Sequence, residues 1–464
     1  MKLKYINVRF IKVAFFVLFA IIVTSCKKYV DIPIAPNMIA NADVYKTDAS
    51  ATSAVLSMYS YSYMPTSIGY FTYLGGLASD ELQTTSSDAA LQEFAQSAVT
   101  TTNSYVLNYL WSYPYTLIRW SNLAIDGITN STTLTPATKS QLLGEAKFFR
   151  AFVYFHLVNY IGNVPLELTP TASSNKAQSS PADVWKQIIS DLKDAESLLP
   201  SAYAGTAAQR GRVNKYAAAA LLARAYLYTK DYPNAETESS KVIGATDVTY
   251  SLAPLANAFI STSPETILQF STLYGYAAFG SAFRTTSSAN NVAPPTYVLY
   301  PGFTNSFEAG DQRKIAWVDS TTYNAKKYYR INKYKLNTAT AGNEYNVILR
   351  LAEQYLIRSE ARAQINPTNL SDAQSDLNKV RNRAGLANTT ATTQTTLLTA
   401  IANERKVELF GEFSHRWFDL VRTGQANTVI GTLKPATWKS TAVLMPVPYS
   451  QILLNTNLIQ NTGY

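Results

Sequence analysis

Hydrophobic residues recur every three to four positions along most of the chain, which is the spacing of an amphipathic α-helix. This period predicts helices over Val44–Met64, Tyr105–Ile128, Pro136–Tyr160, Pro181–Leu199, Lys215–Thr229, Ala235–Ile243, Ile348–Ile365, Ser371–Ala384 and Thr395–Phe410. The stretch from about Leu252 to Asn346 has no long period, is rich in Pro, Gly, Ser and Tyr, and contains only short strand-like runs such as Thr266–Phe270. The pattern predicts a mostly α-helical protein with one long irregular region.

Local chemistry marks several of the predicted helix ends. Asn214 is placed to cap the N-terminus of the helix that starts at Lys215, while Gly162, Pro200 and Gly385 each follow a predicted helix. Stretches rich in Ser and Thr interrupt the helices and predict solvated loops. They are Thr84–Ser104, Thr169–Ser180 and Asn388–Thr396.

Two pairs of helices share a spacing of small residues. Ala223 is followed twelve positions later by Ala235, and Ala361 by Ala373. Alanines at this spacing match the small positions of the tetratricopeptide pattern, where they let the two helices of a hairpin approach closely. Plain antiparallel helices remain the alternative, because one such match is weak evidence in an alanine-rich chain.

The N-terminus has the layout of an export signal. Lys2, Lys4, Arg9 and Lys12 precede an uncharged apolar run, 13–23, that ends just before Cys26. The run is much shorter than the roughly 20 residues that cross a bilayer, so a permanent transmembrane helix is the weaker interpretation. The segment 23–26 is similar to a bacterial lipobox, which implies cleavage before Cys26 and acylation of its sulfur.

Several classes of protein are disfavoured by the composition. The formal net charge is +9, four of the positive charges lie in the N-terminal segment, and no Lys/Arg cluster follows, so we expect no nucleic-acid partner. One cysteine allows no disulfide, and His156 and His415 are the only histidines, so no His/Cys metal cluster is expected. We expect no cofactor, and both histidines are interpreted as packed structural residues.

Five segments carry a resemblance to a known family. They are Gly144–Arg150 with Tyr160–Leu166; Arg212–Tyr232; Leu351–Ala361 with Leu377–Leu386; Asn403–Phe410 with Arg416–Arg422; and Met445–Pro448 with Asn461–Tyr464. In order and spacing they resemble the SusD/RagB family of outer-membrane lipoproteins of Bacteroidetes, and the resemblance runs from the lipobox to the last residue.

The resemblance implies a fold of tetratricopeptide-like helical hairpins packed against an irregular, loop-rich ligand-binding part. It divides the chain into a signal peptide (1–25), a tether (26–41), an N-terminal SusD-like helical region (42–265) and a C-terminal SusD/RagB region (266–464) that includes the last hairpin. The protein is then anchored to outer-membrane lipid through Cys26, palmitate being the expected acyl group, and faces the cell exterior.

In function, the resemblance implies a binding protein without a catalytic cycle. Such a protein captures an oligosaccharide and passes it to a SusC-like TonB-dependent transporter. Three alternatives stay open: capture of peptides or another nutrient on the same architecture, a scaffold or lid of the transporter that binds no nutrient, and, most distantly, an enzyme.

An acid/base constellation in the family motifs needs a separate interpretation. Glu404 and Glu408 lie four residues apart on one helix face, and two carboxylates with a water between them would suit a glycosidase. They alternate with Arg405, Arg416 and Arg422, which favours an ion-pair network between the last helices. Arg150, Arg381, Arg383, Asp311, Arg313 and Asp419 are interpreted as structural in the same way.

Ligand contacts are expected on segments outside the hairpins, because binding residues concentrate on loops carried by a rigid scaffold. Aromatic rings stack on the apolar faces of sugars, and Arg, Asp, Asn and Gln pair with their hydroxyls. The candidates are Asp80 and Gln83 in one segment, and Tyr274, Tyr276, Phe283, Arg284, Asn290, Tyr300 and Trp317 in another. The alternative for each is that it pins an irregular region.

Overall fold

The structure is a computed structural model that describes residues 41–63, 68–171, 175–205, 210–270, 277, 280–284, 293–336 and 344–464. The chain divides into two units, Met1–Val44 and Tyr45–Tyr464. In the first unit the described element is the short helix α2 (Asn41–Val44). No helix in the described ranges is long and apolar enough to cross a membrane.

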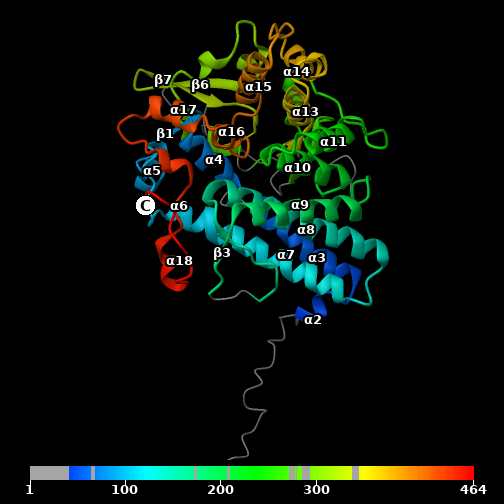
Figure 1. Ribbon diagram of the computed structural model, residues 1–464. Coiled ribbons are helices and arrows are strands. Elements are labelled where there is room, and N and C mark those ends of the chain that lie inside the picture. The colour runs from blue at the N-terminus through cyan, green and yellow to red at the C-terminus, as the bar shows by residue number, and fades with distance from the viewer. Residues whose placement is uncertain are drawn as a thin grey trace, which may run out of the picture. The chain divides into compact units, whose positions relative to one another are not determined.

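The first part of the second unit is a layer of long helices. It contains α3 (Asp48–Tyr63), α4 (Gly69–Ala78), α5 (Ala89–Ala95), α6 (Ser104–Leu107), the π-helical turn η2 (Asn108–Ser112), α7 (Tyr113–Asn130), α8 (Pro136–Ile161) and α9 (Pro181–Leu198). Helices α7, α8 and α9 pack in sequence order, and α3 packs against α7 and α8 (Figure 1). Helix α8 is almost wholly buried from Gly144 onward, so it forms the centre of this layer.

Two helical hairpins continue this stack. The first is α10 (Lys215–Tyr228) with α11 (Tyr232–Ile243), and the second is α13 (Leu351–Ile365) with α14 (Ser371–Arg383). Helix α9 packs against α10 and α11 packs against α13, so the hairpins stack in order although about 100 residues separate them in sequence (Figure 1). Ala223, Ala235, Ala361 and Ala373 are at most 1% exposed, as expected for the small positions of tetratricopeptide-like hairpins.

Capping residues explain where these helices begin and end. The Oδ1 of Asn214 accepts a hydrogen bond from the N–H of Ala217 at 2.9 Å, which confirms the predicted cap of α10. At the end of α14, Gly385 has φ of +79°, a conformation open to glycine. The N–H of Leu386 then bonds back to the carbonyl of Arg381 at 3.0 Å, which closes the helix.

The strands that the structure describes form four two-stranded antiparallel sheets. The pairs are β1 (Leu82–Thr84) with β5 (Tyr297–Leu299), β2 (Val164–Pro165) with β3 (Gln178–Ser179), β4 (Thr266–Phe270) with β8 (Asn346–Arg350), and β6 (Val318–Tyr323) with β7 (Lys326–Ile331). Strand β4 coincides with the predicted strand-like run. The region from Leu252 to Asn346 is nevertheless more regular than expected, since it also holds α12 (Gln312–Trp317) and the β6–β7 hairpin.

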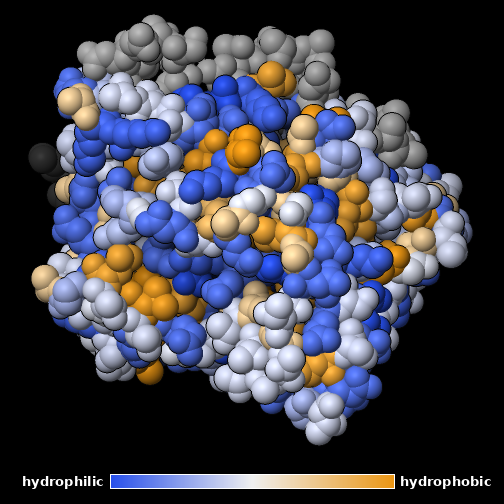
Figure 2. All heavy atoms as spheres, turned by 90° about the horizontal axis from the view of Figure 1, so that it is seen from above, coloured by the Kyte–Doolittle hydropathy of each residue, from blue (hydrophilic) through white to orange (hydrophobic). Residues whose placement is uncertain are grey.

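The C-terminal part consists of α15 (Gln394–Glu408), α16 (His415–Arg422), α17 (Ala426–Leu433) and α18 (Tyr449–Leu454). Short 3-10 turns connect the remaining segments: η4 (Leu255–Asn257), η5 (Gly280–Phe283), η6 (Phe303–Ser306) and η7 (Ser440–Val443). Seen from above, this side of the protein is mostly hydrophilic, with hydrophobic residues in separate patches (Figure 2).

Both histidines are core residues, as predicted. His156 stacks on Phe71 with ring centroids 4.1 Å apart, and its Nδ1 lies 2.8 Å from the carbonyl of Phe152. Burial lowers the pKa of His156 to about 3, and burial also holds the pKa of His415 well below its usual value. Both imidazoles are therefore neutral at physiological pH and serve the packing of the core.

Candidate ligand-binding site

The two segments predicted to bind a ligand meet in the β1–β5 ribbon. In its register Gln83 faces Val298 and Thr84 faces Tyr297, although more than 200 residues separate the strands. The N–H of Tyr300 extends the ribbon by donating to the carbonyl of Glu81 at 2.8 Å. The structure thus brings together two segments that the sequence could only suggest separately.

Helix α4 packs against the β1–β5 ribbon. A Cβ atom added at Gly75 would collide with the side chain of Ser414, and one added at Gly76 would collide with Leu82 of β1. The glycines therefore let α4 approach both the turn before α16 and the first strand. Lys434 caps the C-terminal end of α4, because its Nζ donates a hydrogen bond to the carbonyl of Leu77 at 2.9 Å.

Asp80, predicted as a ligand contact, is instead held in a double ion pair. Its carboxylate accepts hydrogen bonds from Nε of Arg416 at 2.7 Å and from Nζ of Lys406 at 2.8 Å. Burial opposes ionisation, but the Arg416 and Lys406 cations outweigh it and lower the pKa of Asp80 to about 2. Both oxygens are engaged, so Asp80 joins α4 to α15 and α16.

Glu81 is a buried carboxyl group beside the first strand. It is 3% exposed, and its Oε1 accepts a hydrogen bond from the N–H of Gly411 at 3.0 Å. Burial raises the pKa of Glu81 to about 7, which the hydrogen bond from Gly411 only partly offsets. The ribbon is thus attached to the turn between α15 and α16 by a carboxyl group that changes charge near neutral pH.

A cluster of partly exposed tyrosines lies next to the ribbon. We call Tyr70, Tyr105 and Tyr109 the tyrosine cluster. The rings of Tyr70 and Tyr109 are nearly parallel, with centroids 3.7 Å apart, and Tyr105 lies 5.4 Å from Tyr70. Tyr73, which is buried, connects the cluster to the ribbon by stacking on Tyr297 of β5 at 4.4 Å.

Local structure fixes the orientation of this cluster. Asp88 caps α5 with its Oδ1 and accepts a hydrogen bond from the hydroxyl of Tyr105 with its Oδ2 at 2.9 Å. Tyr109 lies in the π-helical turn, where the N–H of Tyr113 bonds to the carbonyl of Asn108. Pro114 follows this turn and has no N–H to donate to a helical hydrogen bond. Its position explains why the helix departs locally from the α-helical hydrogen-bond pattern. The tyrosine faces are therefore held in place before any ligand arrives.

Sequence reasoning missed the tyrosine cluster. Tyr105 and Tyr109 are four positions apart within the predicted helix 105–128, so their shared face was visible in the sequence. Tyr70 joins them from α4, outside any predicted helix, and only the tertiary fold brings the three together.

Two predicted ligand contacts, Trp317 and Phe283, are buried in the structure. Trp317 is 1% exposed, its indole N–H donates to the carbonyl of Leu255 at 3.0 Å, and Lys333 lies 4.7 Å above its ring. Phe283 is 2% exposed and packs edge-on against Tyr73. Both rings pin the irregular region, because neither presents a free face to solvent.

The other candidates differ in how the structure places them. Gln83 and Tyr300 are partly exposed at the ribbon. Arg284 is partly exposed too, but it donates to Oδ1 of Asn332 at 2.6 Å and to the carbonyl of Tyr334 at 3.3 Å, which makes it a brace between segments. Tyr274, Tyr276 and Asn290, like Cys26, lie outside the described residues. Gln83 and Tyr300 stay predicted ligand contacts.

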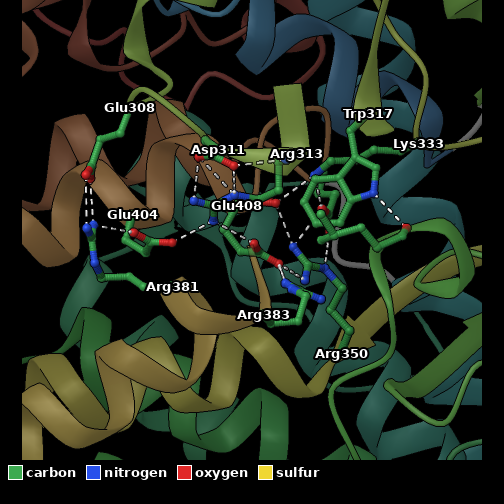
Figure 3. A network of polar contacts seen from close by, with 12 residues as sticks. Glu308, Asp311, Arg313, Trp317, Lys333, Arg350, Arg381, Arg383, Glu404 and Glu408 are labelled. Atoms are coloured by element: carbon green, nitrogen blue, oxygen red, sulfur yellow. Dashed lines mark hydrogen bonds and ion pairs between the residues drawn. The ribbon is translucent and has the colours of Figure 1, made fainter. Parts of the chain in front are cut away.

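The motif carboxylates lie in a buried ion-pair network that Figure 3 shows from close by. Arg313 of α12 contacts Oε1 of Glu404 at 2.6 Å and Oε2 of Glu408 at 2.9 Å. Oε1 of Glu408 pairs with both Arg350 and Arg383. The predicted ion-pair network is confirmed, and it extends beyond the last helices to β8, α12 and α14.

A second ion-pair group lines a cleft between the hairpins and the C-terminal helices. Asp419 pairs with Arg405 and Arg422, each at 2.7 Å, and Arg422 also pairs with Glu360 of α13 at 2.6 Å. These side chains, with Tyr228, form part of the wall of a cleft of about 820 Å³. The lining also includes Lys230 and Arg416, so basic side chains outnumber acidic ones along the cleft.

Metal binding has no support in the described ranges, where no group of three or more His, Cys, Asp or Glu side chains could hold an ion. The acidic residues of the site region are instead paired with Arg, Lys or backbone N–H groups, as Asp80, Glu81 and Asp88 illustrate. The chemistry that the region offers is aromatic stacking and hydrogen bonding.

Two family models match the chain at its two ends. The model described as "SusD family" matches residues 300–464, and the model described as "Starch-binding associating with outer membrane" matches residues 42–227. Among curated proteins, SusD-like protein P38 of Formosa agariphila is 26% identical over 415 residues, which cover 76% of this chain and 79% of that protein. A SusD-like protein of Bacteroides ovatus is 23% identical over 68% of this chain and 65% of its own length.

Solved structures share the fold. A "Laminarin binding SusD-like protein" superimposes with a TM-score of 0.74 and 24% identity, covering 90% of this chain and all of the other. Surface glycan-binding protein A from Bacteroides uniformis has a TM-score of 0.75 and 21% identity, over 89% of this chain and 99% of its own. A SusD superfamily protein from Bacteroides vulgatus has a TM-score of 0.78 and 20% identity, over 90% and 100% of the two chains.

Proposed function

The chain belongs to the SusD/RagB family of nutrient-binding outer-membrane proteins, and we propose from this premise that it captures an oligosaccharide at the cell surface. The observation that carries the proposal is the tyrosine cluster, in which three partly exposed rings stand beside the β1–β5 ribbon. Sugar rings have apolar C–H faces that stack on such aromatic rings, while their hydroxyls need hydrogen-bonding partners at the rim.

The ribbon supplies those partners. Gln83 is partly exposed on β1. Next to the ribbon, the carboxylate of Asp88 is occupied in orienting Tyr105 and capping α5. Tyr300 follows β5 on the same ribbon. A neutral sugar fits this surface better than a charged nutrient, because stacking faces and hydrogen-bonding groups dominate it. The laminarin-binding relative with the same fold supports a glycan ligand.

The membrane attachment in this proposal is a lipid on Cys26. The protein then faces the exterior and passes its ligand to a SusC-like TonB-dependent transporter. The tether, 27–40, has about 14 residues and reaches at most about 50 Å when fully extended. A protein held so close to the bilayer is well placed to load a membrane channel.

The proposal includes no catalytic step. The carboxylates that resemble an acid/base pair have their oxygens engaged by arginines, and both histidines are buried and neutral. A general acid or base must lie within hydrogen-bond reach of the substrate. These groups are buried, so a substrate outside the core does not reach them. Holding and delivering the ligand is the function that this arrangement favours.

Calorimetry on a panel of soluble ligands tests the proposal. The panel contains laminarin, starch-derived and other neutral oligosaccharides, and short peptides of mixed sequence. We expect saturable binding of at least one glycan and recovery of that glycan uncleaved. Binding of peptides alone would favour the peptide-capture alternative, and binding of neither class would favour a scaffold or lid.

A substitution locates the site. Tyr109→Ala removes one stacking face and should weaken glycan binding by about 1 kcal/mol, or roughly fivefold. Tyr61→Ala is the matched control, because Tyr61 is also partly exposed and stacks on Tyr113 at 5.0 Å, but on α3. If both variants bind the glycan equally well, the tyrosine cluster is not the site.

A further inference from the structure

The cleft between the hairpins and the C-terminal helices has the size of a small-molecule site. Its volume is about 820 Å³, and its wall is formed by residues of α10, α11, α13, α15, α16 and α17. None of the described lining residues belongs to the β1–β5 ribbon or to the tyrosine cluster. Ligand sites in proteins have volumes of about 300–1,000 Å³, so the cleft can hold an organic molecule.

One uncompensated positive charge in this cleft is that of Lys230. The wall contains two carboxylates, and the ion pairs of Arg405 and Arg422 engage both of them. Lys230 is exposed in the turn between α10 and α11, where none of the described side chains forms a hydrogen bond or ion pair with its ammonium group. The turn itself is ordered, since the N–H of Asp231 donates to the carbonyl of Tyr226 at 2.9 Å. A free cation is therefore held in the wall of the cleft.

A second excess positive charge comes from α15 and α16. Arg416 of the wall and Lys406 share the single carboxylate of Asp80, at 2.7 and 2.8 Å. Two cations against one anion leave this group positively charged. Because the protein walls of a cleft concentrate the field of such charges, the excess favours a negatively charged ligand.

Two hydrogen-bond donors in the wall lack a partner. Nη1 of Arg405 and the hydroxyl of Tyr228 are buried, and neither has a hydrogen-bond partner among the described residues. Burial raises the pKa of Tyr228, so its hydroxyl stays protonated and can donate. Buried polar groups are normally satisfied, and an unsatisfied one needs an explanation such as a bound molecule. A guanidinium group can only donate, so the group that would satisfy Arg405 is an acceptor, such as a carboxylate or sulfate oxygen.

The rest of the wall suits the hydroxyls and ring faces of a sugar. Side-chain amides and hydroxyls, which both donate and accept hydrogen bonds, occur at Gln364, Thr395, Thr399, Asn403, Thr423 and Gln425. Tyr232 and Leu398 are partly exposed and add apolar surface, against which the C–H face of a sugar ring can pack.

We infer that this cleft is a second binding site, which takes an acidic sugar, that is, a sugar carrying a carboxylate or sulfate group. The acidic group compensates the excess positive charge, and the sugar hydroxyls pair with the amides and threonines. A neutral sugar leaves that charge uncompensated, and a free inorganic anion leaves most of the cleft unfilled. The inference does not rest on the tyrosine cluster, because the two sites share no residue.

Calorimetry on the full-length protein in mild detergent tests the inference. The ligands are trisaccharides of galacturonic acid and of sulfated galactose, the neutral galactose trisaccharide, and acetate and inorganic sulfate alone. We expect at least one acidic trisaccharide to bind at least about tenfold more tightly than the neutral one. Its affinity should fall as the ionic strength rises from about 0.01 M to about 0.1 M, because the Debye length shortens from about 30 Å to about 10 Å.

Two substitutions locate the bound sugar. Ala402→Trp should weaken binding of the acidic trisaccharide at least about tenfold, because Ala402 is an exposed position of α15 in the wall and the indole would fill the cleft. Ala182→Trp is the matched control, on an exposed position of α9 outside the cleft. Lys230→Gln should weaken binding about two- to fivefold by removing the free cation. Lys314→Gln, which removes an exposed charge from α12, should leave binding unchanged.

Each outcome decides the question. Failure of both acidic trisaccharides to bind would overturn the inference, and so would equal affinity for the neutral trisaccharide or for acetate or sulfate alone. Unchanged binding by Ala402→Trp would overturn it as well, since the acidic sugar would then bind elsewhere. Thermal unfolding shows whether Ala402→Trp folds, and Ala402→Leu replaces it if it does not.

Discussion

Glu408 is the residue whose replacement should most clearly show what the family motifs do. Its side chain is fully buried, and Arg313, Arg350 and Arg383 surround it. Burial opposes ionisation, but the three guanidinium groups outweigh it and hold the pKa of Glu408 well below its usual value. The Glu408→Gln variant removes the anion and leaves the cations buried around a neutral amide.

The expected cost follows from the burial of these partners. Removing one member of a buried ion pair costs about 3–5 kcal/mol, because the partner charge stays desolvated and unpaired. Glu408 is 0% exposed and Arg350 is 1% exposed, so solvent cannot compensate. The matched control is Glu308→Gln, because Glu308 pairs with Arg381 but is 56% exposed. An exposed pair contributes only about 0–1 kcal/mol.

Urea denaturation at neutral pH measures both variants. We expect Glu408→Gln to lower the free energy of unfolding by several kcal/mol and Glu308→Gln by less than about 1 kcal/mol. The pKa of Glu408 is lowered on folding, so its stabilisation is present above the unfolded value near 4.5 and is lost as the pH falls through the folded value. The difference from the wild type should therefore shrink in acid. Equal effects of the two substitutions at neutral pH would refute this account of the network.

Three further predictions concern other parts of the molecule. Replacing Ala223 or Ala361 with Leu should overpack a hairpin and lower its stability by about 1–3 kcal/mol, and unchanged unfolding midpoints in both would contradict the hairpin interpretation. Cys26→Ser should release the protein from the membrane on fractionation, and firm retention would show another anchor. Burial raises the pKa of Glu81 to about 7, so wild-type stability should fall by roughly 3 kcal/mol relative to Glu81→Gln as the pH rises from 4.5 past 7. A pH-independent difference would refute that role.

The helices were predictable because their signals are local. The predicted helix 136–160 corresponds to α8 (Pro136–Ile161), and the cap by Asn214 lies where the sequence placed it. The error at 348–365 has a physical cause. Residues 346–350 form the fully buried strand β8, and a short buried strand has a continuous apolar pattern that resembles a helix. The helix begins only at Leu351.

The Ser/Thr-rich stretch 84–104 shows the opposite error. It was predicted to be a solvated loop, but it contains the end of β1 and all of α5. Asp88 was a visible signal, because it is an N-cap residue followed by helix-forming alanines. The Ser/Thr-rich composition favoured a loop over that local signal. Strand β1 could not be predicted locally, because its partner β5 lies more than 200 residues away. The division of the chain at residues 265 and 266 stays a prediction.

Ligand contacts were the least predictable part of the site. The aromatic residues of an irregular region look alike in sequence whether they face solvent or fill the core, and Trp317 and Phe283 fill the core. The tyrosine cluster is the converse case. Tyr70 and Tyr109 come from separate helices, and the face that they share exists only once α4 packs beside the π-helical turn.

The acid/base constellation shows why chemistry visible in a motif need not be the function. Burial raises the pKa of Glu404 while arginines lower that of Glu408, and such a divided pair is what a glycosidase needs. Access decides otherwise, since Glu404 is 2% exposed and its two oxygens contact Arg313 and Arg381. A substrate could reach these carboxylates only by displacing the arginines that join α12, α14 and β8 to α15. The motif therefore stabilises the scaffold, and in the proposed function ligand binding is assigned to the ribbon and the tyrosine cluster, which lie outside this network.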